Sequence, residues 1–304
     1  MSVAAPAMDR RESVDMAAVL VMLVLTFSWG LNGVAAKISY AGFDPVFISI
    51  ARSLLGGLCV YGWCRWRGIA LFTRDGTLWP GALAGLLFGL EFLFLYVGLD
   101  HTTVVRSTLL VNTMPFWVLI GAHFLLGERM SVSKVVGLAL AFGGVALVFS
   151  DKLSLPSPSA IIGDILSLCG GLLWAATTLV IKTTSLARAS AEKLLLYQLS
   201  VSAVMALPLL QFAGPVFREV SAVPVAALAF QAVFIVAVTY VLWFWLMRRY
   251  PAAGLSSFAF LTPVFGVLCG GVLLHEPLSV RIFLALALIG IGLIIVNRPQ
   301  RQRA

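Results

Sequence analysis

The sequence predicts an all-α integral membrane protein, with ten transmembrane helices arranged as two inverted five-helix repeats. Of its 304 residues, 61% are hydrophobic and 11% are charged, and the mean hydropathy is +1.01. Ten apolar segments approach the roughly 20 residues that a helix needs to cross a bilayer. Matching residues also recur at a near-constant spacing in the two halves of the chain. These three observations exclude a soluble globular domain.

The ten apolar segments leave little chain for loops, so any function must lie in the membrane-embedded part. We expect spans at residues 17–39, 44–64, 79–99, 103–125, 131–149, 160–182, 192–213, 222–247, 252–274 and 279–296. The predicted organisation is a cytoplasmic segment at 1–16, a first repeat at 17–149, a linker at 150–159, a second repeat at 160–296 and a cytoplasmic tail at 297–304.

The first apolar segment has a competing interpretation as a cleaved signal peptide. Its residues Val34, Ala35 and Ala36 weakly resemble a cleavage site. We reject this interpretation because the same segment carries Trp29, which matches Trp174 in the sixth segment. Cleavage would discard one member of a repeated pair.

The end of each half contains the same short element. Residues 113–132 and 261–280 align without a gap and are identical at six of twenty positions, including a proline, a glutamate after twelve intervening residues and a serine after that.

The matching pairs along the two halves, at offsets of 145 to 148, are Trp29/Trp174, Asn32/Thr177, Lys37/Lys182, Arg52/Gln198, Pro115/Pro263, Glu128/Glu276 and Ser131/Ser279. A unit of five spans is odd, so the second copy must enter the membrane from the other side. Inverted repeats of this kind are typical of transporters, whose sites lie near the midplane.

Lysine and arginine residues are unevenly divided between the loops. With the N-terminus inside, 15 of the 21 lie on its side, five lie on the other side, and Arg52 is within a span. Because cytoplasmic loops carry the excess of basic residues, this distribution predicts that both termini are cytoplasmic. The net charge of +8 is therefore a topology signal, and no nucleic-acid partner is expected.

The whole pattern resembles a known family. Ten spans in two halves, the early tryptophan, Arg52 in the second span and the repeated proline and glutamate are similar to the drug/metabolite transporter superfamily, EamA type. The resemblance covers nearly the whole chain. It implies a multi-pass protein of a bacterial inner membrane that exports amino acids or other small metabolites. The aromatic content of the expected cavity resembles that of aromatic amino-acid exporters.

Glu91 is the first candidate for a transport role, because it lies near the middle of the third span. A charge at this depth costs about 2.5–3.5 kcal/mol on insertion scales, so such residues face the protein interior, a partner or water. Glu91 could bind the amine of a substrate or exchange a proton with the solvent. It could equally be a structural partner of Arg52 or of another buried donor.

Aromatic and polar residues supply the other expected cavity walls. Trp29 with Asn32, and Trp174 with Thr177, place a ring and a polar group on one helical face in each half. The competing interpretation of the polar members is hydrogen bonding between helices. Further candidates for the same substrate-binding cavity are Asn112, Tyr240 and Trp243.

Two prolines mark candidate helix breaks that could take part in gating. Pro115 and Pro263 leave the carbonyls of Val111 and Ala259 without helical donors. Freed backbone at membrane depth is tolerated where it packs in protein or lines a water-filled cavity. Glu128 is expected to favour the N-terminus of the helix that follows it.

The remaining charged and sulfur-containing residues all have a structural interpretation. Arg52 and Asp164 also have a functional one. Arg52 is either paired or placed to bind a substrate carboxylate, and Asp164 is either a proton site or a residue of the outer interface. The four cysteines all fall in apolar segments and are expected to be small core residues.

Further function classes fit less well. An intramembrane enzyme would need a nucleophile and base, or a motif such as H-E-x-x-H or G-x-S-x-G, and neither motif is present. We therefore expect no catalytic residue, no metal and no cofactor; the partners would be a small molecule and the bilayer, with proton coupling left open. The remaining competing functions are a drug or sugar-phosphate/nucleotide-type translocator of the same superfamily and a structural membrane subunit.

Overall fold

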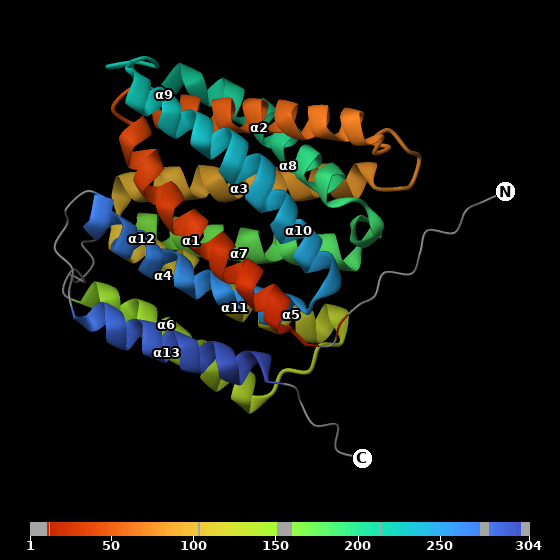
Figure 1. Cartoon of the computed structure of the whole chain (residues 1–304), viewed down its shortest axis with the longest axis vertical. Coiled ribbons are helices and arrows are strands. Elements are labelled where there is room, and N and C mark those ends of the chain that lie inside the picture. The colour runs from red at the N-terminus through yellow and green to blue at the C-terminus, as the bar shows by residue number, and fades with distance from the viewer. Residues whose placement is uncertain are drawn as a thin grey trace.

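The computed structural model describes residues 11, 13–102, 104–150, 160–212, 214–273 and 280–298. Every named element within these residues is a helix (Figure 1). Eight segments are long and apolar enough to cross a membrane, and two further apolar helices are shorter. Over the described residues, this is the predicted fold class of ten membrane helices.

The first half begins with three long helices. They are α1 (Met16–Ser39), α2 (Pro45–Arg67) and α3 (Leu78–His101), followed by α4 (Val104–Val111), α5 (Met114–Leu126) and α6 (Val132–Phe149). Local chemistry determines where these helices start. Asp15 accepts a hydrogen bond from the backbone N–H of Ala18 at 2.9 Å, which caps the first turn of α1. Asp44 caps α2 in the same way, with Pro45 at its first position.

The second half is more irregular than the first. Its elements are α7 (Ala160–Thr183), η2 (Ser185–Arg188), α8 (Ala191–Ala206), η3 (Leu207–Phe212), α9 (Ala222–Ala229), η4 (Phe230–Thr239), α10 (Tyr240–Arg249), α11 (Ala252–Ser257), η5 (Phe258–Phe260), α12 (Leu261–Leu273) and α13 (Arg281–Asn297). The elements η2, η3 and η5 are short 3₁₀ helices, whereas η4 is a π-helix of ten residues. Together α9, η4 and α10 form the eighth span.

Contacts between helix ends define two faces of the bundle. On the terminal face, where α1 begins and α13 ends, the N–H of Arg11 donates to the carbonyl of Arg249 at 2.8 Å. On the opposite face, where α6 ends and α7 begins, the N–H of Arg218 donates to the carbonyl of Gly42 at 2.9 Å. Figure 1 shows successive spans running back and forth between these faces, α1 and α7 in opposite directions. The second repeat is therefore inverted relative to the first.

The two halves pack against each other in matching pairs. α1 packs on α12, and α7 correspondingly packs on α5, so the first helix of each half contacts the fourth span of the other. α6 packs along α13, and α2 packs on α8. At the α1–α12 crossing, a Cβ added to Gly30 would lie 2.6 Å from the backbone nitrogen of Gly266. The absence of a side chain at Gly30 therefore allows these two helices to approach closely.

Both fourth spans are interrupted next to their prolines, in different ways. In the first half, α4 ends at Val111 and α5 begins at Met114, and the hydroxyl of Thr113 donates to the carbonyl of Leu110 at 2.6 Å. In the second half the 3₁₀ segment η5 separates α11 from α12, and Pro263 lies in the first turn of α12. The breaks follow from the missing proline N–H.

The structure corrects the predicted role of Glu128. Its Oε1 accepts from the N–H of Ala252 at 2.9 Å, and its Oε2 accepts from that of Ala253 at 3.4 Å. The carboxylate therefore caps α11 in the other half of the chain, and Ser131 caps the following helix α6 instead. The first turn of α11 exposes backbone N–H groups that favour an anion. Glu276, its counterpart in the repeat, lies outside the described residues.

The expectation that all four cysteines are core residues is wrong for one of them. Cys64 and Cys269 are buried and Cys169 is partly buried, but Cys59 is exposed on α2. A thiol tolerates the lipid-facing surface because it is small and weakly polar.

A reporter experiment tests the arrangement of the two faces in the membrane. We expect a reporter fused after Ala304 and one inserted after Ser150 to lie on opposite sides, with the C-terminal reporter in the cytoplasm. The physical reason is the excess of basic residues on the terminal face. Alkaline phosphatase and green fluorescent protein fusions, which are active on different sides, provide the measurement. The inverted ten-span arrangement is wrong if both positions report the same side.

Candidate functional site

Three of the predicted wall residues form one aromatic group between α1 and α10. The ring of Trp29 lies 5.7 Å from that of Trp243 and 6.3 Å from that of Tyr240, both in edge-to-face geometry. Its indole Nε1–H donates to the hydroxyl of Thr239 at 3.0 Å. Edge-to-face rings with a satisfied indole form a rigid wall.

The π-helix η4 ends at this aromatic group. Thr239 is its last residue, and the hydroxyl also donates to the carbonyl of Ile235 at 2.5 Å. Tyr240 begins the ordinary α-helix α10 that follows. Because π-helices are rare and often occur at functional sites, this change of helix type supports a role for the group that includes Trp29 and Trp243.

Glu91 is buried in the middle of α3, and only 5% of it is exposed. Its Oε2 has no hydrogen-bond partner among the described residues. Within that same part of the chain no ion pair joins it to Arg52, one of the structural partners considered from the sequence. A carboxyl group in this position requires a proton, water or a ligand as its partner.

A second group of predicted residues lies around α7. Gly170 packs against the backbone of Glu91, and a Cβ at Gly171 would lie 2.8 Å from the carbonyl oxygen of Val111, where α4 ends. Trp174, one turn further along α7, packs against the buried cluster that contains Met114. The helix break at Pro115 is thus in contact with the same helix that carries Trp174.

The polar residues of this second group have different environments. Asn112 is buried, and its side-chain amide donates to the carbonyl of Thr108 at 2.8 Å. Thr177 is buried as well, and its hydroxyl donates to the carbonyl of Leu173 at 2.9 Å. Each of these donors is therefore satisfied by the carbonyl four residues earlier in the chain. Asn32 differs, because its Oδ1 is buried without a partner among the described residues.

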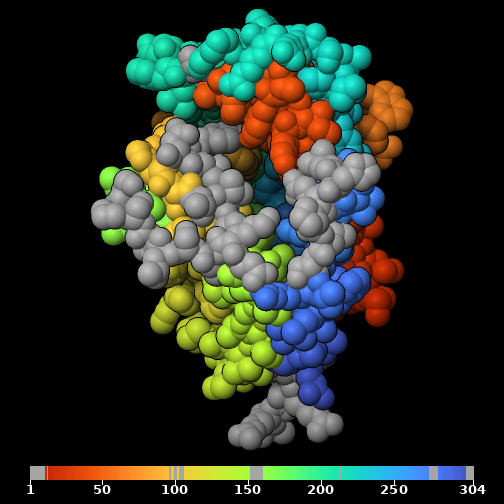
Figure 2. All heavy atoms as spheres, turned by 90° about the vertical axis from the view of Figure 1, so that its left-hand side faces the viewer, coloured from red at the N-terminus to blue at the C-terminus, as the bar shows by residue number. Residues whose placement is uncertain are grey.

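Figure 2 shows the opposite face and a hollow at its centre. Orange-red atoms from the junction of α1 and α2 lie above the hollow, and green and blue atoms from α6 and α13 lie below it. A separate apolar cavity lies between α2, α3 and α8, lined by residues that include Ser49, Phe92 and Met205. None of the residues that line this apolar cavity is charged, which makes it unsuited to a zwitterion.

The sequence-predicted residues thus divide into two groups. Trp29, Tyr240 and Trp243 are in direct contact, whereas Glu91 and Trp174 are related only through the packing of α3, which carries Glu91, on α7, which carries Trp174. Among the described residues, no hydrogen bond or ring contact connects the two groups. Sequence reasoning missed Thr239, the acceptor of the Trp29 indole, since a threonine within an apolar run gives no signal of its partner.

Asp164 belongs to a polar cluster between the two halves on the opposite face. It accepts a hydrogen bond from the hydroxyl of Thr102 at 2.7 Å and one from Nε of Arg106 at 3.1 Å, and Arg106 also forms an ion pair with it. Thr102 and Arg106 come from the first half and Asp164 from the second. Asp164 is therefore an ion-pair partner that joins α4 to α7.

Arg52 and Gln198, a matched pair of the repeat, share an unusual property. The Nε of Arg52 and the Oε1 of Gln198 are both buried without a hydrogen-bond partner among the described residues. Pairing was one of the two interpretations of Arg52, and the structure contradicts it for the Nε atom. Both residues lie in the mutually packed helices α2 and α8.

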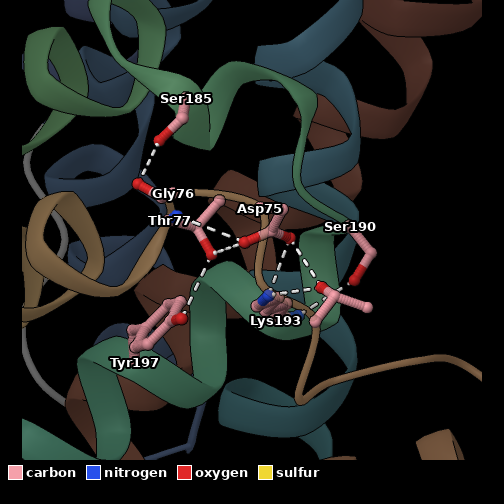
Figure 3. Close-up of polar contacts among 8 residues, drawn as sticks. Asp75, Gly76, Thr77, Ser185, Ser190, Lys193 and Tyr197 are labelled. Carbon is pink, nitrogen blue, oxygen red and sulfur yellow. Dashed lines mark hydrogen bonds and ion pairs between the residues drawn. The ribbon is translucent and has the colours of Figure 1, made fainter.

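The terminal face carries a polar network around Asp75 (Figure 3). Lys193 Nζ donates to Asp75 Oδ2 at 2.8 Å and to the hydroxyl of Thr73 at 2.9 Å. The hydroxyl of Thr77 donates to Asp75 Oδ1 at 2.6 Å and lies 3.1 Å from the hydroxyl of Tyr197. The network connects the loop between α2 and α3 to the start of α8 in the other half.

These contacts hold the pKa of Asp75 well below its ordinary value, mainly because Lys193 donates to the carboxylate, and also because the threonine hydroxyls do. An acid with a lowered pKa in the folded state adds stability above its unfolded pKa, about 3.9, and loses it as the pH falls further. We expect Asp75→Asn to lower stability at pH 7 by about 1 kcal/mol or less, since the exposed carboxylate is screened by solvent.

The measurement is thermal unfolding of the purified protein in detergent, followed by tryptophan fluorescence at several pH values. The difference between wild type and Asp75→Asn should be constant near neutral pH and should shrink below about pH 4. A difference that does not change with pH would show that the charge of Asp75 is not the source of its stabilising effect.

The fold contains inverted repeats of membrane helices and broken fourth spans. It also buries an acid, Glu91, whose Oε2 has no protein partner among the described residues. Together these features define a membrane transporter. More particularly, the chain belongs to the EamA-like transporter family, whose model matches residues 16–150 and 161–298. The two matches correspond to the two halves of the fold.

Relatives agree with this assignment, and a solved structure shares the fold. The chain is 27% identical over 291 residues to the uncharacterized transporter YvbV of Bacillus subtilis, covering 93% of this chain and 92% of that protein. It is 32% identical over 288 residues to the uncharacterized protein PA1977 of Pseudomonas aeruginosa, covering 93% and 95%. A crystal structure of a protein at 21% identity has the same fold, with a TM-score of 0.79 over 92% of this chain and 96% of that one.

Proposed function

We propose that this transporter exports amino acids with aromatic or other apolar side chains from the cytoplasm, by alternating access at a cavity between its two halves. The observation that carries this proposal is Glu91, a carboxyl group that is 5% exposed, lies at mid-span and has no hydrogen-bond partner for its Oε2 among the described residues. A substrate ammonium group would supply the missing partner.

The surroundings of the cavity support the same substrate class. The group of Trp29, Tyr240 and Trp243 provides a ring wall of the kind that receives an apolar side chain. Asn32 offers a buried carbonyl oxygen that is free to accept a hydrogen bond from the polar end of a substrate. A small molecule with one polar end and one apolar end matches these features.

Charge and shape support the proposed orientation in the membrane. The hollow in Figure 2 opens on the opposite face, and the basic residues favour a cytoplasmic position for the terminal face. The proposal thus places the protein in the inner membrane of a bacterium with its cavity open to the outside. Protonation of Glu91 would couple export to the proton gradient, and binding of an ammonium group alone would give facilitated export.

The test is transport by purified protein in liposomes, against a panel of amino acids and with or without a pH gradient. We expect saturable transport of aromatic or large apolar amino acids above that of empty liposomes. The proposal fails if no member of the panel is transported while a drug or a sugar phosphate is. Dependence on the pH gradient distinguishes the coupled from the facilitated form.

A change in the ring wall should alter the choice of substrate. We expect Trp243→Leu to shift the preference among apolar amino acids by about tenfold, because a change in pocket shape alters discrimination by about 1–3 kcal/mol. Competition between labelled phenylalanine and unlabelled leucine in liposomes provides the measurement. Trp245→Leu, in which an exposed tryptophan of the same helix is replaced, is the matched control and should leave the preference unchanged.

A further inference from the structure

The turn between α2 and α3 exposes an unusual number of large aromatic rings. In this α2–α3 corner, defined as residues 62–80, Trp66 is 73% exposed, Phe72 is 92% exposed and Trp79 is 82% exposed. Trp63 is also exposed, and its ring lies 5.2 Å from that of Trp66. Indole rings are enriched at the level of the lipid headgroups. The corner therefore lies at the membrane interface on the terminal face.

The same corner is rich in positive charge. Arg65, Arg67 and Arg74 are all exposed, and the guanidinium of Arg67 lies 5.5 Å from the ring centroid of Trp63. Among the described residues, no ion pair involves any of these three arginines. A guanidinium group presents a planar set of donors that matches a phosphate.

The nearby acids interact with other basic residues. Asp75 is the only acid in the corner. Its carboxylate forms an ion pair with Lys193, a residue of the other half of the protein that is only 5% exposed (Figure 3). Glu192, on the adjoining helix α8, has charge interactions with Arg248 and with the thiol of Cys64 in the corner itself. Within the described part of the chain, no ion pair joins Asp75 or Glu192 to an arginine of the corner.

The opposite face also exposes rings, since Phe212 is 80% and Phe217 is 62% exposed, but these are phenylalanines and not tryptophans. Its α1–α2 turn packs against the segment after η3, where Phe43 and Phe47 contact Phe217. Arg218 is the basic residue of that segment, and its Nη2 lies 3.5 Å from Oδ2 of Asp44. The basic residue of that segment is thus paired with an acid, whereas the arginines of the α2–α3 corner form no ion pair among the described residues.

We propose that the α2–α3 corner is a binding surface for the headgroup phosphate of anionic phospholipids in the leaflet at the terminal face. The arginines bind the phosphate, and the exposed rings hold the corner at headgroup depth. Because the Asp75 network fixes the loop to α8, a lipid bound here contacts an element that joins the two halves. The occupant is a lipid and not a soluble phosphate, since the surrounding rings are positioned for the bilayer interface.

Lipid binding to the full-length purified protein tests the proposal. Native mass spectrometry would count bound phosphatidylglycerol and phosphatidylcholine on wild type, on Arg65→Gln/Arg67→Gln, and on the control Arg129→Gln/Arg298→Gln. The control removes two exposed arginines of the same face, away from the corner. Each basic residue near an anionic surface contributes about fivefold in affinity, so the corner variant should bind phosphatidylglycerol about thirtyfold more weakly.

We expect wild type and the control to prefer phosphatidylglycerol, and the corner variant to lose this preference while keeping its thermal unfolding temperature in lipid-free detergent. Addition of inorganic phosphate should not displace the lipid. Equal binding of both lipids by wild type, equal loss in the two double variants, or displacement by inorganic phosphate would each overturn the proposal. Because the readout is lipid binding, its failure leaves the proposed transport function untouched.

Discussion

Replacement of Glu91 by glutamine is expected to reduce transport by about ten- to a hundredfold while the protein remains folded and inserted. The physical reason is the loss of a charged partner: a hydrogen bond to an ionised group contributes about 1.5–3 kcal/mol, and glutamine keeps the shape without the charge. The effect is large because this carboxyl group is buried and its Oε2 has no partner among the described residues. Initial rates of amino-acid efflux from liposomes provide the measurement.

The matched control is Glu219→Gln, the same chemical change at an exposed position in the segment before α9. It should keep the wild-type rate. If Glu91→Gln transports at the full rate but unfolds at a lower temperature, Glu91 is a structural residue and the binding site lies elsewhere. If instead it transports without responding to a pH gradient that stimulates wild type, Glu91 is the proton site and not the ammonium partner.

Features that depend on periodicity and on single residues with strong backbone effects were predictable. Hydropathy predicted the spans, and Pro115 and Pro263 predicted the interruptions of the fourth spans because proline removes a helical donor wherever it occurs. The inverted arrangement followed from the odd number of spans in a repeated unit. These features follow from local chemistry and from the number of spans in each half. They can be predicted without knowing which residues meet in the folded protein.

Features that depend on a distant partner were not predictable. Glu128 was correctly expected to cap a helix, but the helix it caps begins at Ala252, 124 positions away. The π-helix Phe230–Thr239 contains neither proline nor glycine, so nothing in its own residues distinguishes it from an ordinary apolar span.

The candidate site shows the same division. The contact of Trp29 with Tyr240 and Trp243 agrees with an inverted repeat, in which the first span of one half approaches the third span of the other. The position of Trp174 beside Met114 does not reproduce that contact in the other half. The repeat therefore predicts which helices meet, and the individual side chains determine how each interface differs.

Gly30→Ala is expected to destabilise the protein by about 2–3 kcal/mol, the upper part of the range found when extra atoms are forced into a well-packed interior. The new Cβ would lie 2.6 Å from the nitrogen of Gly266 and 2.8 Å from the carbonyl carbon of Phe265. Both are backbone atoms, so no side-chain rotation can relieve the overlap, and α1 and α12 would have to move apart. Thermal unfolding in detergent and efflux from liposomes should both reveal the loss.

Two substitutions on the same pair of helices separate this clash from a general effect of replacing glycine. Gly33 has no atom within 4 Å of an added Cβ, so Gly33→Ala should be neutral or slightly stabilising, because alanine favours a helix by about 0.5–1 kcal/mol over glycine. At Gly266 the nearest atom would be the carbonyl oxygen of Gly30 at 3.6 Å, an ordinary contact, so Gly266→Ala should be tolerated. If Gly30→Ala unfolds at the same temperature as Gly33→Ala, α1 and α12 do not approach this closely in the membrane. In that case neither α1 nor α12 needs a glycine at the point where the two helices cross.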